Sequence, residues 1–195
     1  QPEQEETDFI KIESPEEIKV CDPACGSGHM LTYAFDLLYA IYAEQGYDPS
    51  QIPSLVLQKN LFGIEIDKRA GDLAAFALVM KARARARRFF SRGVEPNICV
   101  LQNVTFTAEE INAYMQVVGN DLFTQDLWVA LKQFEQADNF GSLIQPKFKD
   151  VAYVRSRLEE KKVLENLFLH NTNQKVQLVL KQAEYLLTRY YVAVA

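Results

Sequence analysis

The fold of this 195-residue chain is decided by the stretch VCDPACGSGHML, residues 20–31. A short apolar run from Ile18 to Cys21 stops abruptly at Asp22-Pro23, as a buried strand would. Two glycines follow, and apolar residues then recur at helical spacing. A strand, a tight turn of small residues and a helix in this order predict the first unit of a parallel sheet covered by helices.

Two more strands continue the alternation. Leu61 to Ile66 is the second strand candidate, and a helix is predicted from about Lys68 to Phe90. Asn97 to Leu101 is the third strand candidate. Short apolar strands that alternate with helices predict an α/β fold with a parallel sheet. Four residues of the second helix are expected to face the core: Leu73, Phe76, Ala77 and Met80.

The rest of the chain divides by its patterns into three further parts. Residues 107–188 contain several helical patterns separated by glycine and proline breaks, and they predict a largely helical insertion. Residues 189–195 are a fourth strand candidate, which we expect to be truncated. Residues 1–17 carry seven acidic side chains and are expected to be weakly structured. Residues 18–106 remain as the core of the fold.

Composition and charge exclude several classes of protein. Hydrophobic residues make up 48% of the chain and charged residues 24%, which is typical of a folded domain and not of a disordered tail. The formal net charge of -5 is opposite to that of a basic nucleic-acid-binding module, so a DNA-binding surface would have to be local or lie elsewhere in a longer protein. The sequence contains no membrane-spanning apolar run and no secretion signal.

The three cysteines favour a cytoplasmic protein. Their number is odd, which suits a reducing compartment better than a disulfide scaffold. The sequence has only two histidines and no second ligand pair at zinc spacing, so no metal site is expected.

The glycine turn predicts a ligand site at the start of the first helix. Glycines let the backbone approach a ligand closely, and the free N–H groups of a helix N-terminus suit a carboxylate or a phosphate. Leu31 replaces the third glycine of a dinucleotide fingerprint, and no P-loop lysine follows Gly28 before Lys59. Asp22 would repel a phosphate but suits a ligand with a cationic amine or sulfonium, which points to S-adenosylmethionine.

A second signal is the sequence GIEID, residues 63–67, at the end of the second strand. A carboxylate at this position can accept hydrogen bonds from both hydroxyls of a ribose. Each such bond to a charged group contributes roughly 1.5–3 kcal/mol. Glu65 is therefore a candidate ribose ligand, and Ile66 offers an apolar face to an adenine.

DPACGSG followed by a strand that ends in GIEID resembles the N6-adenine-specific DNA methyltransferases. That family is class I, Rossmann-like and dependent on S-adenosylmethionine, and it includes type I and type IIG restriction-modification enzymes. The stretches NLFGIEIDKRAGDLAAFALVMKAR and EYLLTRYYVAVA look most like the PglX-type methyltransferases of bacteriophage-exclusion (BREX) systems. The resemblance covers Val20 to Arg92 well and the last dozen residues more loosely.

The resemblance implies which residues bind S-adenosylmethionine. The turn would hold the methionine part, Glu65 the ribose and Ile66 the adenine. Asn103, where the family often has Asp, would contact the adenine amine. The expected cofactor-binding residues are Asp22, Pro23, Ala24, Cys25, Gly26, Ser27, Gly28, His29, Met30, Glu65, Ile66 and Asn103.

The resemblance also implies a catalytic motif that this sequence lacks. In the family, Asn or Asp, then Pro-Pro and an aromatic residue follow the fourth strand and hold the flipped target adenine. The chain contains no Pro-Pro pair, and its fourth strand ends at Ala195, where the motif would begin. We therefore expect a cofactor-binding fragment of a site-specific DNA methyltransferase, inactive alone and with no catalytic residue in this chain.

The expected setting is restriction-modification or phage exclusion. DNA, reached through other parts of the full-length protein, and other defence-system subunits are the expected partners, and no membrane is. Two other functions remain open: a methyltransferase that acts on RNA or protein, and a non-catalytic nucleoside-binding or scaffold module.

Overall fold

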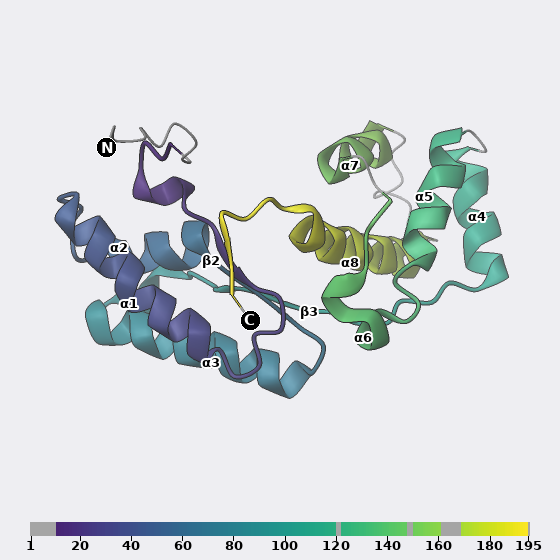
Figure 1. Ribbon diagram of the computed structural model, residues 1–195. Helices are drawn as coiled ribbons and strands as arrows, with labels where there is room; N and C mark the ends of the chain where they lie inside the picture. The colour runs from purple at the N-terminus through teal and green to yellow at the C-terminus, as the bar shows by residue number, and fades with distance from the viewer. Residues whose placement is uncertain (1–10, 120–121, 148–149, 161–168, 195) are drawn as a thin grey trace, which may run out of the picture.

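A computed structural model describes residues 11–119, 122–147, 150–160 and 169–194 (Figure 1). Its four strands form one parallel sheet in the order β3-β2-β1-β4, which confirms the predicted α/β fold. The strand expected at residues 189–195 is two residues long, and Ala195 lies outside the described residues. The strands are β1 (Val20–Asp22), β2 (Leu61–Glu65), β3 (Asn97–Val100) and β4 (Val192–Ala193).

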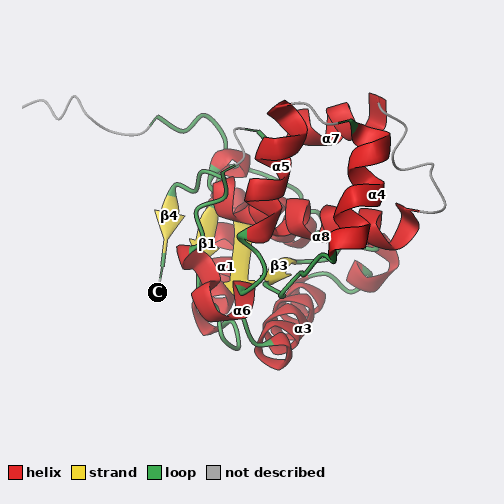
Figure 2. Cartoon of the chain, turned by 90° about the vertical axis from the view of Figure 1, so that its right-hand side faces the viewer, coloured by secondary structure: helices red, strands yellow, loops and turns green. Residues whose placement is uncertain are grey.

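Helices cover both faces of the sheet (Figures 1 and 2). Alternate residues of a strand point to opposite faces, so Val20 packs with α1 and α3 while Cys21 packs with α8. The elements of the first face are α1 (His29–Glu44), α2 (Ile52–Leu55), a π-helical turn η2 (Val56–Asn60), α3 (Lys68–Arg85) and a 3-10 turn η3 (Phe89–Arg92).

Residues 107–188, expected as a helical insertion, contain the remaining described helices. They share a core in which the Trp128 ring meets the rings of Phe106 and Tyr114 edge to face, with centroids 5.2 and 5.5 Å apart. These helices are α4 (Ala108–Val118), α5 (Leu122–Lys132), α6 (Ala137–Phe140), a 3-10 turn η4 (Gly141–Leu143), α7 (Val151–Glu160) and α8 (His170–Leu187). No helix within the described ranges combines the length and apolar character that crossing a membrane requires.

The predicted core face of α3 is wrong. The side chains of Leu73, Phe76 and Met80 are 52%, 62% and 45% exposed, and Ala77 is only partly buried. The first two buried positions of α3, Gly71 and Ala74, are small because the helix lies very close to β3 and to the β1–α1 turn there. A Cβ atom at Gly71 would lie 2.6 Å from Cγ2 of Val100. The residues of α3 that are buried are Gly71, Ala74, Leu78 and Ala82.

A buried asparagine ties the N-terminal segment to the core. Asn60 is fully buried, and its Nδ2 donates to the carbonyl oxygens of Pro15 at 2.6 Å and Ile18 at 2.8 Å. Tyr42 donates its hydroxyl hydrogen to Oδ1 of Asn60 at 2.9 Å. Within residues 1–17, expected as weakly structured, Pro15–Glu17 forms a 3-10 turn, η1, and residues 1–10 lie outside the described residues.

Candidate cofactor site

The turn between β1 and α1 is hydrogen-bonded to the end of β2. Cys25 donates its backbone N–H to the carbonyl oxygen of Ile64 at 3.0 Å, and Gly28 N–H donates to the oxygen of Cys25 at 2.7 Å. Asp22 is 3% exposed at the end of β1, and its Oδ1 accepts from the N–H of Ala24 at 3.1 Å. The predicted glycine turn is therefore a fixed structure that links two neighbouring strands at the carboxyl edge of the sheet.

Two glycines of the turn have different roles. Gly28 has a φ of 81° and precedes α1, and a Cβ atom there would lie 3.0 Å from Cβ of Ala74. Only glycine suits this position, because it has both a left-handed conformation and a helix in contact with it. Gly26 has a φ of 51°, and nothing lies within 4 Å of the position where its Cβ would be. On the side where a side chain would project, Gly26 is therefore not covered by other protein atoms.

Glu65 joins the end of β2 to the turn. Its Oε2 accepts a hydrogen bond from the backbone N–H of Gly26 at 2.6 Å. Its Oε1 accepts from the N–H groups of Ile66 at 2.8 Å and Asp67 at 3.0 Å. The two acids that the sequence singled out, Asp22 and Glu65, are therefore brought to the same turn.

The turn is a region of negative potential. Burial raises the pKa of the Asp22 carboxyl, the charge of Glu65 raises it further, and the hydrogen bond from Ala24 acts in the opposite direction. Burial, together with the charges of Glu65 and Asp22, raises the pKa of Cys25 to about 12. Cys25 is therefore a neutral thiol at pH 7 and not a nucleophile. A cationic ligand group is favoured at this turn, and an anion beside Asp22 is not.

The other predicted residues follow the ends of the three strands or begin α1. Met30 is 47% exposed, and His29 is exposed in the first turn of α1. Ile66 follows Glu65 and is 49% exposed. Asn103 follows β3, and its Oδ1 accepts from the backbone N–H of Asp138 at 3.0 Å.

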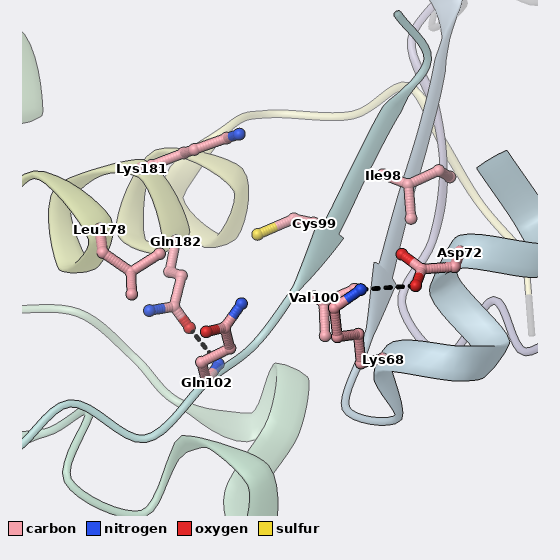
Figure 3. A pocket seen from close by; sticks show the side chains of 9 residues that line it. All are labelled: Lys68, Asp72, Ile98, Cys99, Val100, Gln102, Leu178, Lys181 and Gln182. Carbon is pink, nitrogen blue, oxygen red and sulfur yellow. Dashed lines mark hydrogen bonds and ion pairs between the residues drawn. The ribbon is translucent and has the colours of Figure 1, made fainter.

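Sequence patterns do not predict two residues beside the strand ends, Gln182 near the end of β3 and Gly141 near the end of β2. Gln182 of α8 is fully buried, and its Oε1 accepts from the N–H of Gln102 at 2.7 Å (Figure 3). Gly141 lies against Ile66, since a Cβ at Gly141 would be 3.3 Å from Cγ2 of Ile66. No spacing rule relates residues so far apart in sequence.

The pocket of Figure 3 is a different cavity, at the outer edge of β3 between α3 and α8. Its volume is about 230 Å³, and an exposed ion pair between Lys68 and Asp72 (2.5 Å) lies at one side. It contains none of the predicted cofactor residues. Among the residues that the structure describes, no cluster of histidine, cysteine, aspartate or glutamate side chains could hold a metal ion. The pocket is lined by Lys68, Asp72, Ile98, Cys99, Val100, Gln102, Leu178, Lys181 and Gln182.

A parallel sheet, a glycine turn after its first strand and an acid at the end of its second strand are the features of a Rossmann-like nucleotide-binding fold. Comparison with known proteins agrees. Residues 9–94 match the family model described as "MmeI, DNA-methyltransferase domain".

Two curated relatives extend the match. The chain is 42% identical over 165 residues to the adenine-specific methyltransferase BrxX of Escherichia coli O9:H4 (strain HS), and the match covers 74% of this chain and 14% of BrxX. It is 36% identical over 129 residues to the adenine-specific methyltransferase PglX of Lacticaseibacillus casei (strain Zhang), covering 66% of this chain and 11% of PglX. The predicted resemblance is confirmed, and the chain spans only a small part of the length of these relatives.

Proposed function

We propose that this chain binds S-adenosylmethionine at the β1–α1 turn and belongs to a protein that methylates N6 of adenine in DNA. The observation that carries the proposal is the pair of acids, Asp22 and Glu65, held at one glycine turn with an open side at Gly26. The match to a DNA-methyltransferase domain and the names of the two relatives support the activity and the target base.

Each part of the cofactor has a chemically suitable partner. Asp22 would attract the cationic amine and sulfonium, and the N-terminus of α1 would favour the methionine carboxylate. Glu65 would accept from the ribose hydroxyls. Ile66 and Asn103 would contact the adenine. When bound, the cofactor supplies a methyl group on a positively charged sulfur, and the residues of this chain hold and orient it.

Glu65 must exchange partners when it binds ribose. A carboxylate has about four acceptor positions, and three are used here by the N–H groups of Gly26, Ile66 and Asp67. Two ribose hydroxyls need two positions. We therefore expect the bond from Gly26 to Glu65 to break on binding, so that the turn adjusts as the ribose enters.

These residues would bind the cofactor, and they would not hold the adenine that receives the methyl group. The base must leave the DNA duplex to reach the methyl group. The Asn-Pro-Pro-aromatic motif that holds such a base in related enzymes does not occur in this sequence. Phage exclusion in the cytoplasm is the setting we propose, because the relatives are of BrxX and PglX type and the cysteines are free thiols.

Isothermal titration of the intact protein with S-adenosylmethionine tests the proposal. We expect Glu65→Gln to raise the Kd about 10- to 150-fold, which corresponds to the roughly 1.5–3 kcal/mol of one hydrogen bond to a charged group. Glu44→Gln, at the exposed end of α1, is the control and should leave the Kd unchanged. If the unaltered protein does not bind, or if Glu65→Gln binds equally well, the proposal is rejected.

The target is tested separately with radiolabelled S-adenosylmethionine and matched DNA, RNA and protein substrates. Transfer to adenine in DNA supports the proposed activity. Transfer to RNA or protein alone would replace the DNA target, and cofactor binding without any transfer would favour a binding module.

A further inference from the structure

A short segment of the helical insertion lies at the end of β2, beside the candidate cofactor site. The segment consists of α6 and η4, residues 137–143, and it is about 75 residues away in sequence from Ile66. A Cβ atom at Gly141 would lie 3.3 Å from Cγ2 of Ile66, so the backbone of the segment passes close to that side chain. Figure 1 shows α6 beside the carboxyl ends of the strands. We call residues 137–143 the insertion segment.

Hydrogen bonds from the loop after β3 hold the insertion segment in place. Oδ1 of Asn103 accepts from the N–H of Asp138 at 3.0 Å, and Val104 N–H donates to the oxygen of Phe134 at 3.0 Å. Gln133 closes the loop behind the segment, since its Oε1 accepts from Lys147 N–H at 2.9 Å. Its Nε2 also donates to the oxygen of Gln145 at 2.9 Å. The loop after β3 therefore holds the start of the segment, and the bonds of Gln133 hold the residues that follow it.

Gly141 is suited to this contact in two ways. Its φ of 55° lies in the left-handed region, which residues with a Cβ atom rarely adopt. The space beside it is limited by Ile66, which is still 49% exposed. A side chain at position 141 would therefore crowd Ile66 and change the apolar surface at the end of β2.

We propose that the insertion segment forms a wall of the purine pocket of the cofactor site, with Gly141 next to Ile66. The ligand group is the adenine of S-adenosylmethionine, so the inference rests on the proposed function. Asn103 is then a positioning residue as well, because its side-chain oxygen holds Asp138. The helical insertion thereby contributes to the site together with the two strand ends.

Photo-crosslinking tests the placement of the base. The intact protein is irradiated with an S-adenosylmethionine analogue that carries an azide at C8 of adenine, and tryptic peptides are analysed by mass spectrometry. We expect labelling of the peptide Gln133–Lys147, which contains the insertion segment, and of Asn60–Lys68, which contains Ile66. An excess of unmodified S-adenosylmethionine should suppress both.

The outcomes separate this inference from the proposed function. Suppressible labelling of Asn60–Lys68 without Gln133–Lys147 would overturn the inference and leave the proposed function standing. Absence of any suppressible labelling would overturn both.

A pair of glycine variants provides an independent test. Gly93 has a φ of 62° and a ψ of 28°, with open space around its Cβ position, so Gly93→Ala strains the backbone without crowding a neighbour. Gly141 has a ψ of -137°, so Gly141→Ala adds greater backbone strain to the crowding of Ile66. We expect Gly141→Ala to raise the Kd for S-adenosylmethionine at least fivefold and Gly93→Ala to leave it within twofold, with the larger fall in Tm for Gly141→Ala. If the two variants bind with equal affinity, the inference is contradicted. If Gly141 had only a structural role, Gly141→Ala would lower the Tm and leave the Kd unchanged.

Discussion

At the scale of single residues, Asp22 connects the stability of the protein to ligand binding. Its carboxyl group is 3% exposed and lies near the charge of Glu65, and both effects raise its pKa. An ionised group in that position destabilises the folded chain, and a cationic ligand relieves the destabilisation. Functional sites often contain such perturbed groups for this reason.

Asp22→Asn should therefore separate stability from binding. The amide keeps an oxygen that can accept from Ala24 N–H but carries no charge. We expect the Tm without cofactor to be equal or higher at pH 7, and the Kd for S-adenosylmethionine to rise about 10- to 150-fold. Calorimetry on both variants measures the two quantities. A large fall in Tm with unchanged affinity would show that Asp22 is purely structural.

The raised pKa of Asp22 also predicts opposite pH dependences for stability and binding. The folded chain holds the Asp22 proton more tightly than the unfolded chain, so this group's contribution to the free energy of unfolding falls as the pH rises through the interval above the ordinary Asp pKa of about 4. Affinity for the cationic cofactor should rise over the same interval, because the ionised form binds it.

Urea unfolding and titration calorimetry at a series of pH values from about 4 upward measure both dependences, and Asp22→Asn is the control. In Asp22→Asn, we expect this pH dependence to be lost both from the free energy of unfolding and from the affinity for the cofactor. Curves that are unchanged by the substitution would assign the titration to another group.

At the scale of elements, the π-helical turn η2 is held to α1 and to the N-terminal segment by Asn60. Asn60→Ala would remove the bonds that the Tyr42 hydroxyl and the Ile18 carbonyl make with Asn60, whereas the Pro15 carbonyl keeps a bond from the N–H of Ile18 at 3.2 Å. We expect a loss of about 2 kcal/mol or more in the free energy of unfolding, because two groups lose their bond and each unsatisfied buried group costs roughly 1–3 kcal/mol. Tyr42→Phe removes one of the bonds and should cost about 1 kcal/mol. Urea denaturation that ranked the two variants equally would contradict this account.

The face that α3 turns to the sheet gives a second prediction at this scale. Ala74→Leu would place a large side chain where Gly28 already lies in close contact. Overpacking of this kind costs roughly 1–3 kcal/mol or more. Phe76→Ser, at a position that is 62% exposed, should change stability by only about 0.5 kcal/mol. Thermal unfolding of both variants is the measurement, and the reverse order would mean that the helix is rotated.

The same helix shows where sequence patterns fail. Both the set Leu73, Phe76 and Met80 and the set Ala74, Leu78 and Ala82 have helical spacing, so periodicity alone allows either face. Hydrophobicity favours the first set, but the close approach of α3 at Gly71 and Ala74 selects the second, in which Leu78 is the one large side chain. The strands and the glycine turn were predictable because their signals are contiguous in the sequence.

At the scale of the whole molecule, part of the candidate site depends on contacts between distant segments. The acids at the ends of β1 and β2 were predictable, since parallel strands end at one edge of the sheet. The contacts of Asn103 with Asp138, of Gln102 with Gln182 and of Ile66 with Gly141 were not, because each depends on how the helical insertion packs. The insertion therefore supports the site in a way that no local motif indicates.

The most direct test of the central claim is an NMR titration of protein labelled with 15N-glycine. We expect S-adenosylmethionine to shift the amide signals of Gly26 and Gly28 strongly, with Gly26 losing its bond to Glu65, while Gly46 and Gly93 stay unchanged. Signals of Gly26 and Gly28 that do not move at saturating cofactor would contradict the claim.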